Sequence, residues 1–270
     1  MSGLGKQYRL AALRASIADI ERRPALAEPR AVPRQDAASG FPMLAGGMLQ
    51  EIFTAERRNG GAALGFALAQ ARGLLTPVRQ AVIYLQMLAE AQEMGLPYGP
   101  GLASFGFDPD ALVLIRPANI GELLWAAEEA LACRAVAAVI ADVAGQPKIL
   151  DFTASRRLSL RSDASGATLL LLRYGAWREA SAAQLRWYLQ PVLSGETEFD
   201  ARAPGQTRWR ARLEKGVIAG RQEQDWLLEW TPNGFESITD SRPEADRIAD
   251  GAAVSDPLPT QLGDGLLQTA

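Results

Sequence analysis

The sequence predicts an α/β fold, with a mostly parallel central sheet flanked by helices and an antiparallel hairpin at one edge. Between about residues 46 and 175, short apolar runs alternate with helical patterns, as in successive strand–helix–strand crossovers. The runs at 136–143 and 168–173 are apolar on both faces, which is typical of central parallel strands. After residue 180 apolar and polar residues alternate instead, which indicates strands with one wet face.

The individual elements follow from the period of the apolar residues. The core strands are predicted at 48–53, 81–85, 112–115, 136–143 and 168–173. The helices are predicted at 62–72, 99–105, 120–133 and 153–164. Thr153 or Ser155 is the expected N-cap of the last helix.

The edge hairpin is predicted from two alternating runs, 208–213 and 225–230. In the first run, Trp209 faces the opposite way from Arg208 and Arg210. Trp209 is therefore expected to pack in the core and the arginines to lie on the other face.

Prolines and charge divide the rest of the chain. Residues 1–23 are predicted to form an amphipathic helical arm, which either folds back on its own domain or docks on a partner or neighbouring protomer. Residues 24–42 form a proline-containing linker, and residues 43–236 form the main domain. Residues 237–270 are an acidic tail with little apolar periodicity, and this composition predicts disorder.

Composition excludes several kinds of chemistry. The chain has no histidine, so histidine-based acid–base catalysis and histidine-ligated metals are excluded. Its one cysteine, Cys133, permits no intrachain disulfide or thiolate cluster, and we expect it to be a small core residue. The net charge of −3 provides no general attraction to nucleic acid. No apolar run is long enough to span a membrane, so a cytoplasmic protein is expected.

A phosphate-binding loop is expected after the first strand of such a fold, and here it is degenerate. A functional loop of this type carries glycines, a lysine for the phosphates and a hydroxyl for Mg²⁺. The glycine-rich turn into a helix is present at Gly60 and Gly61. Ala62 and Ala63 stand where the lysine and the hydroxyl residue would be. Arg57 or Arg58 could approach a phosphate, which leaves weak nucleotide binding open, but ATP hydrolysis is not expected. We predict no cofactor, no metal and no catalytic residue.

Two acidic features have both a structural and a functional interpretation. Asp142 ends the strand at 136–143, where a Walker B aspartate would lie, and it could equally be a polar residue at a strand end. Glu128 and Glu129 are neighbours on a helix and do not converge on one point. We expect a solvated face with a capping or salt-bridge role for this pair.

Two groups of arginines are candidate contacts for a partner or for DNA. Both groups could equally be exposed or ion-paired faces, or could bind an acidic protein surface or a DNA backbone. One group lies on the helix at 153–164 and the other on the first strand of the hairpin: Arg156, Arg157 and Arg161, and Arg208, Arg210 and Arg212.

Several segments together resemble the ImuA family of RecA-related accessory proteins of the bacterial inducible mutagenesis cassette. The segments span roughly residues 41–231 and lie at 47–53, 62–68, 98–108, 124–131, 154–158, 209–210 and 226–230. The resemblance implies a RecA-like core and a role in DNA-damage-induced (SOS) translesion synthesis. It brings no catalytic residues.

The resemblance also implies partners for the chain. These are ImuB, which is a Y-family polymerase relative, the error-prone copy of the replicative polymerase α subunit, and RecA. A complex with them would associate with the nucleoid. Two alternative functions stay open: a SulA-like inhibitor of cell division, and a DNA-binding relative of RecA-like ATPases.

Overall fold

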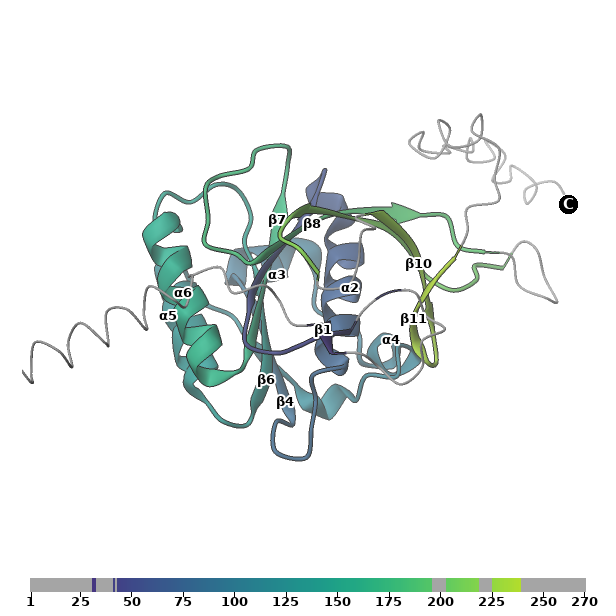
Figure 1. Cartoon of the computed structure of the whole chain (residues 1–270), viewed down its shortest axis with the longest axis horizontal. Helices are drawn as coiled ribbons and strands as arrows, with labels where there is room; N and C mark the ends of the chain where they lie inside the picture. The colour runs from purple at the N-terminus through teal and green to yellow at the C-terminus, as the bar shows by residue number, and fades with distance from the viewer. Residues whose placement is uncertain (1–30, 33–40, 42, 196–202, 219–224, 239–270) are drawn as a thin grey trace, which may run out of the picture. The chain divides into compact units, whose positions relative to one another are not determined.

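The computed structural model describes residues 31–32, 41, 43–195, 203–218 and 225–238. The predicted arm at 1–23, most of the linker at 24–42 and the tail beyond residue 238 lie outside the described residues. The described part forms an α/β fold with one large open sheet and helices on both of its faces (Figure 1). The predicted fold class is therefore confirmed.

The sheet of the described chain has nine strands in the order β11-β10-β9-β8-β3-β7-β6-β4-β5. The strands from β8 to β5 in this order run parallel, whereas β9, β10 and β11 are antiparallel to their neighbours. Their bounds are β3 Leu49–Thr54, β4 Ala81–Gln86, β5 Leu112–Ile115, β6 Val136–Asp142, β7 Thr168–Tyr174, β8 Leu185–Val192, β9 Arg208–Lys215, β10 Asp225–Thr231 and β11 Gly234–Ser237. A separate two-stranded ladder pairs β1, Ala31–Val32, with β2, Met43–Leu44.

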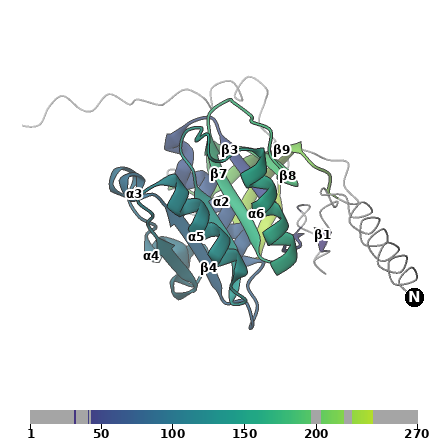
Figure 2. The same ribbon diagram turned by 90° about the vertical axis from the view of Figure 1, so that its left-hand side faces the viewer.

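The helices cover the sheet in two layers. Helices α5, Ile120–Ala132, and α6, Phe152–Ser165, lie side by side on one face (Figure 2). Helix α2, Gly60–Arg72, packs on the other face, and β9, β10 and β11 curve round it (Figure 1). Two short helices, α3, Leu88–Met94, and α4, Gly99–Ser104, follow β4. None of the described helices is long and apolar enough to cross a membrane.

The core on the α2 face is rich in aromatic rings. Trp187, Trp209 and Trp226 come from three neighbouring strands and are fully buried. Phe66 of α2 lies between the first two, with ring centroids 5.9 Å and 6.3 Å away. Burial of such large side chains is the main source of stability for this half of the sheet. The expectation that Trp209 packs in the core is confirmed.

Two local expectations are wrong. Cys133 is exposed, because it follows the last residue of α5 in the turn before β6. The N-cap of α6 is Asp151, whose carboxylate accepts the Ala154 N–H at 2.7 Å, since the helix starts at Phe152, one residue before the predicted start. The Ser155 hydroxyl instead donates to the Phe152 carbonyl and accepts the Ala182 N–H.

The antiparallel part of the sheet is larger than predicted. The expected pair, β9 and β10, is present, but β8 and β11 flank it and were not predicted. β8 carries Pro191, and a proline argues against a strand. Pro191 lies beyond the part of β8 that pairs with β3, so the missing N–H breaks no bond on that side.

Candidate functional site

A cluster of charged and phenolic side chains lies at the carboxyl ends of the parallel strands, on the α2 face. Arg57 follows β3 in a short 3-10 turn at Arg57–Asn59, and Asp142 ends β6. Tyr84 lies in β4, Tyr174 ends β7, and Glu90 comes from α3. Ligands of open parallel sheets bind at this end of the strands, so the cluster occupies the place where a binding site is expected.

Arg57 binds both carboxylates of the cluster. Its Nη1 lies 2.7 Å from Asp142 Oδ1, and its Nη2 lies 2.6 Å from Glu90 Oε2. Its Nε donates to the same Glu90 oxygen at 3.0 Å. The guanidinium also lies 4.4 Å from the centre of the Tyr174 ring, within range of a cation–π contact. All of its three nitrogens are therefore engaged.

Asp142 is the centre of the cluster. Its side chain is 4% exposed, and it accepts hydrogen bonds from the Tyr84 hydroxyl at 3.1 Å and the Tyr174 hydroxyl at 2.8 Å. A buried carboxylate needs such donors and a counter-charge to offset its desolvation. The donors here all belong to the chain itself.

The electrostatics of the cluster favour a charged arginine and neutral phenols. Burial lowers the pKa of the Arg57 guanidinium, but the hydrogen bond and charge of Asp142 outweigh it, so the net pKa is raised. Burial, followed by the charge of Asp142, raises the pKa of Tyr84 well above its ordinary value. The same two causes raise the pKa of Tyr174.

The degenerate loop lies directly beside this cluster. Gly60 begins α2, and a Cβ there would lie 3.3 Å from the Tyr174 hydroxyl and 3.6 Å from Arg57 Nη1. The glycine therefore leaves room for Tyr174 and Arg57 at the start of the helix. Gly61 has open space around its missing Cβ, and Ala62 and Ala63 follow in the first turn of α2.

Sequence reasoning located part of this cluster. It placed Asp142 at a strand end and noted that Arg57 or Arg58 could approach the site. Arg57 turns inward onto the carboxylates, whereas Arg58 is exposed and pairs with Glu56. Glu90, Tyr84 and Tyr174 were missed. Both tyrosines resemble ordinary apolar strand residues, and no local signal marks Glu90.

Comparison with known proteins identifies relatives of the chain. No family model matches it. Two curated proteins, each called Protein ImuA, from Caulobacter vibrioides strains NA1000 / CB15N and ATCC 19089 / CIP 103742 / CB 15, are each 29% identical to it over 184 residues. The match covers 64% of this chain and 70% of each relative. The chain is therefore similar to ImuA proteins, which supports the resemblance seen in its sequence segments.

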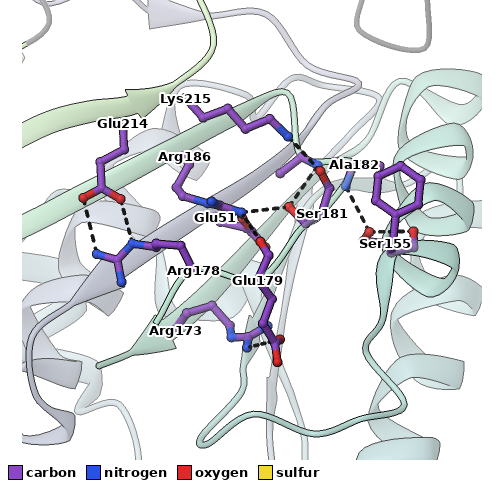
Figure 3. Close-up of polar contacts among 12 residues, drawn as sticks. Glu51, Ser155, Arg173, Arg178, Glu179, Ser181, Ala182, Arg186, Glu214 and Lys215 are labelled. Carbon is purple, nitrogen blue, oxygen red and sulfur yellow. Dashed lines mark hydrogen bonds and ion pairs between the residues drawn. The ribbon is translucent and has the colours of Figure 1, made fainter. Parts of the chain in front are cut away.

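A second polar network lies on the opposite face of the sheet (Figure 3). Glu51 of β3 is buried and pairs with Arg186 of β8 at 2.7 Å. Arg178 binds Glu214 at 2.7 Å and lies 4.0 Å from the centre of the Phe53 ring. These contacts tie β3 to β8 and β9 on this face of the sheet.

The hairpin arginines predicted as contacts belong largely to this face. Arg208 pairs with Glu229 of β10 at 2.5 Å, and Arg212 lies 3.4 Å from Glu214. Arg210 is half-buried between them along the strand. Acidic side chains of the same sheet thus neutralise part of this arginine face, as in cross-strand pairs of opposite charge.

Two of the α6 arginines lie against one acidic residue. Glu128 of α5 binds Arg157 Nε at 2.5 Å and Arg161 Nη2 at 3.3 Å. The salt-bridge role expected for Glu128 is confirmed, although its side chain is 11% exposed and not solvated as predicted. Glu129 is exposed, and Arg156 is exposed on the neighbouring side of α6.

The raised phenol pKa values predict instability in alkali. Since the folded pKa of both tyrosines lies above the unfolded value of about 10, the unfolded chain loses these protons first as pH rises. Stability is therefore complete below about pH 10 and should fall above it, by up to about 2.7 kcal/mol per pH unit for two groups. Urea unfolding between about pH 8 and about pH 11 measures this slope.

Variants assign the slope to the two buried phenols. The double variant Tyr84→Phe, Tyr174→Phe should lose much of the alkaline steepening, whereas Tyr98→Phe should retain it, because Tyr98 is 73% exposed. If the stability of the double variant decreased as steeply with pH as that of the wild type, these phenols would ionise normally in the folded protein.

Proposed function

We propose that this chain is an ImuA protein, a non-catalytic accessory protein of DNA-damage-induced mutagenesis that acts through contacts with other proteins. The proposed partners are an ImuB-like relative of Y-family polymerases, an error-prone polymerase α subunit and RecA. The proposed location is the cytoplasm, with nucleoid association in the complex. The similarity to ImuA proteins supports the mutagenesis role, and the geometry of Arg57 supports the non-catalytic one.

The observation that carries the proposal is the pairing of Arg57 with Asp142. Phosphoryl transfer requires a cation and a magnesium hydroxyl placed around the phosphates. Here Ala62 and Ala63 supply neither group, and the only cation beside Asp142 in the described residues is Arg57. For Arg57 to bind a nucleotide, its contacts with both Asp142 and Glu90 would have to break. Among the described residues, no group of three His, Cys, Asp or Glu side chains could hold a metal ion.

The proposal predicts that ATP and Mg²⁺ neither bind nor turn over. Isothermal titration calorimetry of the full chain should give no binding heat, because Asp142 and Glu90 already hold Arg57, the cation beside the degenerate loop. A phosphate-release assay should stay at the level of buffer, with a RecA ATPase measured under the same conditions as the positive control. Saturable heat accompanied by phosphate release would overturn the non-catalytic assignment.

A further inference from the structure

The outward face of α6 forms a groove that the described fold leaves uncovered. The residues that line it recur every three or four positions, so they follow one stripe of the helix. They are Thr153, Arg156, Arg157, Leu160, Arg161 and Ala164. The stripe spans about three turns, or roughly 16 Å at 1.5 Å per residue. Figure 2 shows α6 facing outward beside α5.

Glu128 holds two arginines of this groove, and all three arginines remain accessible. Glu128 accepts a hydrogen bond from the Nε of Arg157. The two terminal nitrogens of Arg157 make no hydrogen bond to any described residue. The side chains of Arg157 and Arg161 are still 54% and 43% exposed. Arg156 is exposed and has no ion pair within the described ranges. Three guanidinium groups and one carboxylate give the groove a net charge of +2.

Apolar side chains lie along the same stripe as these cations. Leu160 is 52% exposed, and Phe152, which is two turns before it, is 49% exposed. Arg156 lies between them at the i+4 position from Phe152. Large apolar groups exposed beside arginines are the composition of protein interfaces, where arginine and aromatic residues contribute most of the binding energy.

We propose that this groove binds an acidic amphipathic helix of a partner protein, of about three turns. This inference rests on the proposed function and specifies the surface and the partner chemistry. The carboxylates of the partner would bind Arg156 and the two terminal nitrogens of Arg157, with bidentate geometry open to both residues. One apolar residue of the partner would cover Leu160, in the manner of a helix seated in a groove.

A protein segment fits these features better than a nucleic-acid backbone does. A phosphate backbone would satisfy the arginines, but it offers no apolar group to cover Leu160. Burial of an apolar side chain contributes about 25 cal/mol per Å² of surface removed from water, and only a peptide supplies it here. The pairing of Arg157 and Arg161 with Glu128 also reduces the positive charge that a polyanion would meet.

The test measures binding of the full chain to the ImuB-like partner by biolayer interferometry. The groove variant combines Arg156→Glu with Leu160→Asp, because both residues are exposed and neither contacts Glu128. The control variant combines Arg116→Glu with Leu193→Asp; it makes the same charge changes at exposed sites outside the groove. The groove variant should bind at least about tenfold more weakly, and the control should match the wild type.

The outcomes separate the inference from the proposed function. If the wild type binds and the groove variant binds equally well, the inference fails and the proposed function stands. If the wild type itself does not bind, the proposed function fails and the inference fails with it. Fluorescence anisotropy with a single-stranded DNA oligomer provides a third arm. A groove variant that loses DNA but retains the partner would make this a nucleic-acid site and overturn the inference. Circular dichroism confirms that each variant is folded.

Discussion

Replacement of Arg57 by alanine is expected to lower the free energy of unfolding by about 3 kcal/mol, since it removes one partner of a buried ion pair. Asp142 is only 3% exposed, and its carboxylate would lose its counter-charge while remaining out of water. Glu90 would lose its partner in the same step. For a domain of this size, the loss corresponds to a decrease in Tm of roughly 6–12 °C in a thermal melt.

The neighbouring residue provides a matched control for this variant. Arg58→Ala removes an exposed ion pair with Glu56 and should change stability by no more than about 0.5 kcal/mol. Addition of Asp142→Asn to Arg57→Ala should recover part of the loss, because the uncompensated charge is gone. Equal stability of Arg57→Ala and the wild type would show that Asp142 does not depend on the guanidinium.

Replacement of Trp209 by alanine is expected to cost about 3–5 kcal/mol, as for other large aromatic residues in a core. Its side chain is fully buried, and its Nε1 donates to the Ala62 carbonyl at 3.0 Å. Its ring lies 6.3 Å from Phe66 and 5.8 Å from Phe235, so the cavity would open between β9, α2 and β11. Urea denaturation followed by circular dichroism measures the loss.

A second tryptophan serves as the control for the same chemical change. Trp177 is 76% exposed in the loop between β7 and β8, and Trp177→Ala should alter stability by no more than about 0.5 kcal/mol. If the two variants were equally stable, the aromatic cluster of the α2 face would not be the stabilising core that its burial indicates.

The strands of the parallel core could be predicted because their apolar runs are fully buried. In β6 and β7 the burial continues on both faces, so the pattern does not depend on which neighbour a strand has. β8 was missed because its signal depends on its neighbours. Arg186 is acceptable in that strand only because Glu51 of β3 lies opposite it, and this pairing joins residues far apart in sequence.

The candidate site could be predicted only in part, for the same reason. Asp142 was located because the carboxyl end of a strand is a position that the chain order itself defines. Glu90 contacts Arg57 from the short helix α3, which follows β4, and the two residues are 33 positions apart in the sequence. Tyr84 differs from an apolar strand residue only by its hydroxyl, and nothing near it in sequence indicates that Asp142 accepts a hydrogen bond from that hydroxyl.

The arginine at the end of β3 has a consequence for control of the protein. A nucleotide is a ligand that dissociates, and its exchange lets the shape of a binding site follow the cellular energy charge. The guanidinium of Arg57 is covalently attached and stays ionised throughout the physiological pH range. The geometry around Asp142 therefore does not depend on a ligand that can dissociate. The amount of protein made and the partners present would then determine when the protein acts.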